Sequence, residues 1–132
     1  MELLYKYSSV KKYVFLMFGL TLLITLCLSN VSAYQVKYYG KVNLVNISSF
    51  NIPDKYFDGI KVIRINEKCI YLPNDKMIGA WYQPNVIDMF CYNANKKNLI
   101  HELSHHQQFI NNDKLGHDKQ FYIYEDEITY AT

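Results

Sequence analysis

The order of the predicted elements indicates an α+β domain, in which a small, mostly antiparallel sheet packs on two helices. Three observations predict this class. Short segments rich in β-branched and aromatic residues fill the chain after residue 33. A segment with apolar residues at helical spacing follows them, and a second helical segment closes the chain. Strands that precede the helices, instead of alternating with them, are typical of α+β folds and not of doubly wound ones.

The N-terminal part of the chain looks separate from this domain. Lys11 and Lys12 precede an uncharged run, VFLMFGLTLLITLCL, which ends near the small residues Ser32 and Ala33. This is the layout of a secretory signal. The run is short for a spanning helix, which needs roughly twenty apolar residues, so cleavage after Ala33 is preferred over a membrane anchor.

We therefore expect residues 1–33 to be a signal peptide or an N-terminal membrane anchor, and residues 34–132 to form one domain. In the anchor alternative, residues 14–28 tether the protein to the membrane and the lysines stay inside. The domain is secreted or otherwise extracytoplasmic in both cases. Its oligomeric state is left open.

The charge balance argues against a nucleic-acid partner. The formal net charge of +2 comes from the N-terminal segment, because residues 1–33 contain three Lys and one Glu. Residues 34–132 carry 11 basic and 11 acidic side chains, and the sequence shows no clustered basic face. A protein that binds phosphate backbones needs such a face, so no nucleic acid is expected.

The predicted domain contains two cysteines, Cys69 and Cys91. An even number of cysteines in an exported small domain favours a disulfide, and two buried thiols are the alternative. Neither cysteine belongs to a C-x-x-C pair, so they are poor candidates for zinc ligands.

The first strands are predicted from alternation. Residues 34–46 alternate polar with β-branched or aromatic side chains, as a half-buried strand does. Residues 48–59 are a connection with one helical turn at residues 54–57. Residues 60–72, IKVIRINEKCIYL, are the clearest strand material, and we expect them to break near residues 66–68 into two strands of a hairpin.

The later strands are short. The Pro-Asn-Asp segment at residues 73–75 is a turn. Residues 78–82 and 86–92 then form two strands, separated by a turn at residues 83–85 that contains proline.

Two helices close the chain. Asn98 is placed to cap a helix over residues 99–111. Gly116 supplies a break, and a last helix is predicted over residues 118–130.

The first of these helices carries the segment HELSH. His101 and His105 are four residues apart, so their imidazoles project from one helix face, one turn apart, and can share a metal ion. Glu102 lies beside them. A catalytic zinc keeps one position open for water, and a nearby carboxylate takes the proton when that water attacks a carbonyl. Glu102 fits this role of general base.

The spacing around the motif predicts a buried helix. Leu99, Leu103 and Ile110 recur at helical intervals and should form an apolar stripe. The alternative is that the histidines lie on a solvated face. His106 projects about a quarter turn away from His105, so we expect it to face solvent or substrate and not the metal.

The segment NLIHELSHHQQ resembles the active-site helix of the zincin metallopeptidases. The resemblance covers only a small part of the chain. It implies a Zn²⁺ cofactor and a peptide or protein substrate. Zincins build a sheet whose edge strand pairs with an extended substrate, and the segment IGAWYQPNVIDMF is similar in placement to that edge.

The third zinc ligand has two candidates. The metzincin pattern is excluded, because its glycine and histidine positions hold Gln108 and Asn111. The segment GHDKQFY is similar to the one that follows the motif helix in SprT-like and WLM-type zincins, which implies His117 as a ligand. Glu125, in EDEI, resembles the E-x-x-A element of gluzincins. His117 is preferred, and the other residue could orient a metal-bound imidazole.

The sequence thus predicts an exported zinc metallopeptidase with His101, His105 and His117 as ligands and Glu102 as base. The alternative is a non-catalytic zinc-binding interaction domain, secreted or tethered to the membrane. A structural zinc site of that kind would be closed by a fourth protein ligand.

Overall fold

The computed structural model describes residues 34–42, 44–91 and 93–132. The predicted signal or anchor, with its cleavage position after Ala33, lies outside these residues. Within the described ranges, no helix has both the length and the apolar character needed to cross a membrane.

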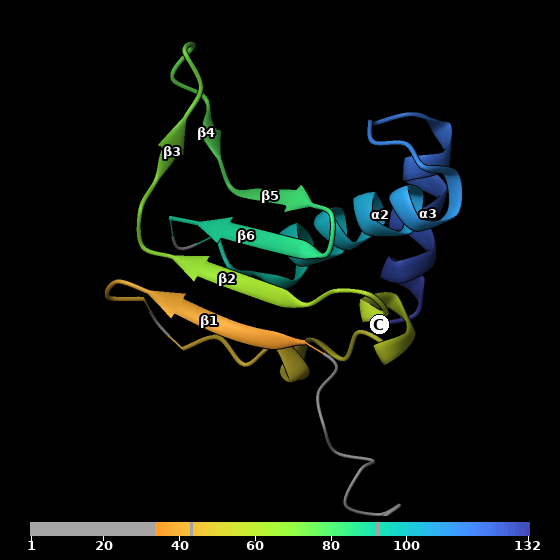
Figure 1. Cartoon of the computed structure of the whole chain (residues 1–132), viewed down its shortest axis with the longest axis horizontal. Helices are drawn as coiled ribbons and strands as arrows, with labels where there is room; N and C mark the ends of the chain where they lie inside the picture. The colour runs from red at the N-terminus through yellow and green to blue at the C-terminus, as the bar shows by residue number, and fades with distance from the viewer. Residues whose placement is uncertain (1–33, 43, 92) are drawn as a thin grey trace, which may run out of the picture. The chain divides into compact units, whose positions relative to one another are not determined.

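The described residues form the predicted α+β fold, with a four-stranded sheet, a small hairpin and the α-helices α2 (Lys96–Asn112) and α3 (Lys119–Tyr130) (Figure 1). The strand order in the sheet is β1-β2-β6-β5. The strands are β1 (Gln35–Tyr39), β2 (Val62–Asn66), β5 (Ala80–Gln83) and β6 (Val86–Phe90).

The expectation of a mostly antiparallel sheet was wrong. β1 pairs with β2, and β2 with β6, in parallel, and only the β5–β6 pair is antiparallel. Parallel neighbours require a connection of a dozen or more residues, and both parallel pairs have one. Residues 40–61 connect β1 to β2 through the 3-10 helices η1 (Ile47–Phe50) and η2 (Asp54–Phe57), and residues 67–85 connect β2 to β6.

The predicted hairpin within residues 60–72 was also wrong, although both of its strands exist. β2 lies in the middle of the sheet with a partner on each side, so it has no free edge for a third strand. β3 (Ile70–Tyr71) pairs instead with β4 (Met77–Ile78), across the predicted turn, in a separate antiparallel hairpin. This β3–β4 hairpin projects from the sheet beside β5 (Figure 1).

The Cys69–Cys91 disulfide is formed, with 4.5 Å between the Cα atoms. Cys69 immediately precedes β3 and Cys91 immediately follows β6, so the bond ties the base of the hairpin to the sheet. Disulfides persist in oxidising compartments, which points to an extracytoplasmic location.

The HELSH helix is α2 (Lys96–Asn112), and it packs on β5 and β6. Its cap is Asn95 and not Asn98, because the Asn95 side chain accepts the Asn98 backbone N–H at 2.9 Å. The apolar stripe holds for its first two members, whereas Ile110 is 49% exposed. Alternate residues of the sheet meet α2 in the core, which includes Ile63, Ile65, Tyr82, Ile87, Met89, Leu99 and Leu103.

The closing helix is α3 (Lys119–Tyr130), and it packs against α2. Asp118 caps it by accepting the Phe121 backbone N–H at 3.0 Å. α3 packs along α2. The short loop between the two helices, residues 114–117, lies near the HELSH face.

Candidate metal centre

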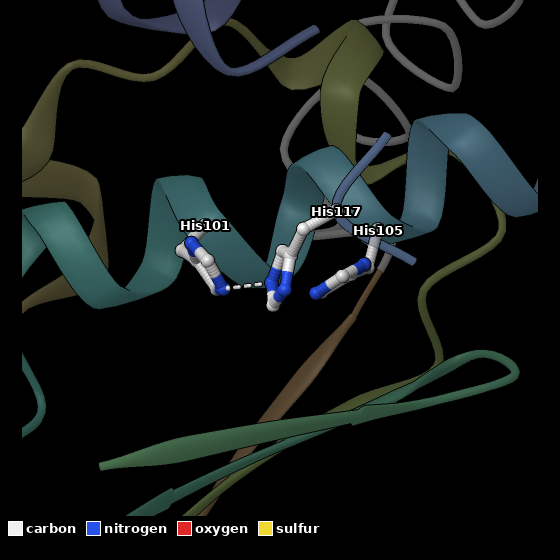
Figure 2. A group of neighbouring side chains, drawn as sticks. All are labelled: His101, His105 and His117. Carbon is white, nitrogen blue, oxygen red and sulfur yellow. Dashed lines mark hydrogen bonds between the residues drawn. The ribbon is translucent and has the colours of Figure 1, made fainter. Parts of the chain in front are cut away.

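Three histidines converge beside one face of α2. His101 and His105 come from consecutive turns of the helix, and His117 comes from the loop before α3. Figure 2 shows the three imidazoles pointing toward one another. Their ring centroids are 4.9 to 5.1 Å apart, and one nitrogen from each lies within 4.8 Å of the others. This His101–His105–His117 group could hold a metal ion.

The closest approach within the group joins His101 and His117, whose Nε2 atoms are 3.0 Å apart. Imidazole nitrogens gathered in this way are suited to a metal that accepts nitrogen ligands. The helical spacing thus accounts for two donors, and chain folding supplies the third.

Phe121 packs against all three imidazoles. Its ring centroid lies 4.9, 4.5 and 4.7 Å from those of His101, His105 and His117, and its side chain is fully buried. Contact with a buried aromatic ring restricts the rotamers that each imidazole can adopt. Phe121 belongs to the GHDKQFY segment that resembles the one after the motif helix in SprT-like and WLM-type zincins, but no role was predicted for it from the sequence.

Glu125 lies on the outer side of the group. Its Oε1 is 3.0 Å from Nδ1 of His101, whereas Nε2 of His101 faces His117. A carboxylate on one ring nitrogen keeps the proton there and leaves the other nitrogen free to bind a metal. Of the two candidates left open by the sequence, the structure gathers His117 with the other histidines and places Glu125 behind His101.

His105 is held in its neutral form. Burial, together with charge repulsion from the neighbouring His101 and His117, lowers its pKa to about 4, although a hydrogen bond with the Gln108 side chain acts in the opposite direction. Because a neutral imidazole is the form that binds metals, this environment suits a ligand.

Glu102 lies beside the group and is 5% exposed. Burial raises its pKa to about 7 despite a hydrogen bond with the Tyr82 backbone, which acts to lower it. Tyr82 belongs to β5, the edge strand of the sheet. The carboxyl group is therefore held between the motif helix and that edge.

A cleft of about 580 Å³ opens onto these residues. Its walls are α2, β5, the β3–β4 hairpin and the loop at residues 115–117. Apolar side chains from the hairpin and β5, including Met77, Ile78 and Trp81, line it together with His101, Glu102, His105 and His117. A concave site with apolar walls and a few convergent polar groups is typical of ligand binding.

His106 does not face solvent or substrate as expected. It is fully buried, with Nε2 at 2.7 Å from the Asp58 carbonyl and Nδ1 at 3.0 Å from the Tyr82 hydroxyl. A carbonyl only accepts, so Nε2 carries the proton and the Tyr82 hydroxyl donates to Nδ1. Burial lowers the pKa of His106, which keeps it neutral. His106 is a structural residue that links α2 to the sheet and to the end of η2.

No protein-family model, curated protein or solved structure matches this chain. The likeness to zincins therefore rests on the HELSH helix and on the geometry of the residues around it.

Proposed function

We propose that the protein is a zinc-dependent metallopeptidase that acts outside the cytoplasm and hydrolyses peptide bonds. The observation that carries the proposal is the place of Glu102. A buried carboxyl group lies next to three converging imidazoles and lines the same cleft. This is the combination that metal-assisted hydrolysis requires.

The donor set suits a catalytic zinc. The group formed by the described residues contains three nitrogen donors. Three protein ligands leave a fourth position open, which is typical of catalytic zinc sites. When bound there, zinc would lower the pKa of a water molecule and polarise the substrate carbonyl.

Within this scheme, Glu102 accepts the proton of the attacking water and then delivers it to the departing amine. Its hydrogen bond with the Tyr82 backbone holds the carboxyl group in place for both transfers. Glu125 keeps the proton of His101 on Nδ1, so that Nε2 stays available as a ligand.

The edge strand β5 offers a place for an extended peptide. β5 is paired with β6 on one side and forms a wall of the cleft on the other. A peptide added as a further strand would run past Glu102 and the histidines.

A non-catalytic zinc domain is the less supported alternative. A structural site needs a fourth protein donor, and Glu125 is the nearest candidate from the sequence. The Glu125 carboxylate contacts Nδ1 of His101, whereas Nε2 is the nitrogen of that ring that faces His117. Glu125 is therefore not one of the residues that form the three-histidine group.

The test is to measure zinc content and peptide cleavage for the wild type and for Glu102→Gln. We expect the variant to keep its zinc and to lose activity by about 10² to 10⁴-fold, because general acid–base catalysis contributes this much. Asp126→Asn is the control, since it removes an exposed carboxylate of α3 and should change neither property. A folded wild type without zinc, or a fully active Glu102→Gln protein, would contradict the proposal.

A further inference from the structure

Most side chains of the loop that carries His117 are exposed, so packing contributes little to holding the loop in place. It connects α2 to α3, and the side chains of Lys114, Leu115 and His117 are exposed. A short exposed segment of this kind is ordered mainly by its hydrogen bonds. The imidazole of His117 contacts Phe121 and His101, but the backbone that carries it depends on the bonds made by its neighbours.

Both neighbours of His117 are held by one side chain, that of Gln108. The Gly116 backbone N–H donates to Oε1 of Gln108 at 3.0 Å. Nε2 of Gln108 donates to Oδ1 of Asp118 at 2.9 Å. Gln108 is only 1% exposed, so its carboxamide has no water to replace these partners. A flipped amide would set donor against donor and acceptor against acceptor, which leaves one favourable orientation.

Asp118 extends this arrangement to α3. The oxygen that accepts from Gln108 also accepts the Phe121 backbone N–H at 3.0 Å and caps the helix. Phe121 in turn packs on the three imidazoles. Gln108 thus connects α2, the loop and the first turn of α3 at the point where His117 enters the group.

We infer that Gln108 is a positioning residue for the third metal ligand: its carboxamide holds Gly116 and Asp118 so that the His117 imidazole meets those of His101 and His105. This role rests on the proposed zinc site but not on peptidase activity. Because the Gln108 side chain also interacts with His105, the role is tested by metal affinity together with protection of the Gly116 amide. Gln108 occupies the position where metzincins have glycine. In this chain its side chain supports the loop that supplies the third donor.

Gln107 provides a matched control. It precedes Gln108 on α2 and is 9% exposed. Its Nε2 donates to the Tyr56 carbonyl at 3.2 Å, which ties the helix to η2 and not to the His117 loop. Replacing either glutamine by Met keeps a similar side-chain volume and removes the hydrogen bonds.

The first experiment measures zinc affinity by competition with a chromophoric chelator. We expect Gln108→Met to bind zinc about 10-fold more weakly, as is usual when residues that orient metal ligands are replaced. Gln107→Met should bind zinc as the wild type does. An equal loss in both variants would overturn the inference, because it would reflect general destabilisation.

Asp118→Ser keeps the test open if Gln108→Met does not fold. Ser can still cap α3, and the substitution is at an exposed position, but the carboxylate that accepts from Gln108 is gone. We expect zinc affinity to fall in this variant as well. Unchanged affinity would count against the inference.

A second readout needs no metal. In the zinc-free protein, the Gly116 amide should be protected from hydrogen exchange in the wild type and in Gln107→Met, and should exchange faster in Gln108→Met. An unprotected Gly116 amide in the wild type would overturn the inference. A wild type that binds no zinc would remove the proposed function too, whereas a zinc-binding wild type matched by Gln108→Met would remove the positioning role alone.

Discussion

The two ring nitrogens of His101 have different partners, and this separates the roles of His117 and Glu125. Nε2 faces the His117 imidazole and Nδ1 faces the Glu125 carboxylate, each at 3.0 Å. One residue thus shares the proposed metal position with His101, and the other orients His101 from behind. Sequence spacing could not decide between them, because both fall within reach of a returning helix.

This assignment predicts unequal effects on zinc binding. His117→Ala removes a ligand and should leave no zinc bound after gel filtration. Glu125→Ala removes an orienting carboxylate and should weaken zinc affinity by about 10 to 100-fold without abolishing binding. Zinc content and chelator competition measure both outcomes. The reverse order of effects would support the gluzincin arrangement and refute ours.

Burial has opposite consequences for two neighbours on α2. It lowers the pKa of His105 to about 4 and raises that of Glu102 to about 7. Both shifts have the same cause, since removal from water disfavours the charged form of each group. His105 therefore stays neutral at physiological pH, ready to bind a metal.

The β3–β4 hairpin depends on its surroundings for its position. A two-stranded hairpin is marginally stable alone, and this one has two residues in each strand. The Cys69–Cys91 bond fastens its base to the end of β6. Since the hairpin forms one wall of the cleft, the disulfide also holds that wall beside the candidate metal centre.

The disulfide should contribute to the stability of the whole domain. In the Cys69→Ser, Cys91→Ser double variant, we expect the free energy of unfolding to fall by roughly 3 kcal/mol, because the unfolded chain regains the entropy of an open loop. Urea denaturation measures the change. Wild-type protein kept under strong reductant is the control and should show the same loss. If the double variant and the oxidised wild type unfold at the same urea concentration, the disulfide contributes negligibly to stability.

Most elements were located from the sequence, while their partners were not. Residues 60–65 and 86–90 are rich in β-branched and aromatic side chains, and this composition predicts strands because such side chains pack well on a pleated sheet surface. It does not say which strand lies beside which. The pairing of β2 with β1 and β6 joins segments far apart in the chain, so local pattern carried no signal for it.

At the scale of the whole molecule, zinc binding should be linked to folding. The three donors come from two turns of α2 and from the loop that follows it, so they converge only in the folded chain. A metal that binds only the folded state stabilises it by mass action.

We therefore expect zinc at a hundred times its dissociation constant to raise the free energy of unfolding by about 2.7 kcal/mol. Thermal unfolding with and without a chelator measures this gain. Glu102→Gln should retain it, because Glu102 is not a ligand, whereas His105→Ala should lose it. A gain that survives the loss of His105 would place the zinc elsewhere.

The sequence alone determined the α+β class, the positions of the helices and most strands, the HELSH pair and the identity of the candidate third donors. The class, the elements and the HELSH pair follow from local periodicity and spacing, which a helix or strand imposes on nearby residues. The candidate third donors came instead from the likeness of GHDKQFY and EDEI to segments of known zincins. The tertiary structure decided the parallel pairing of the sheet, the burial of His106, the place of Glu125 and the role of Gln108. Each of these depends on contacts between separate elements of the fold, and such contacts form only when the elements are packed together.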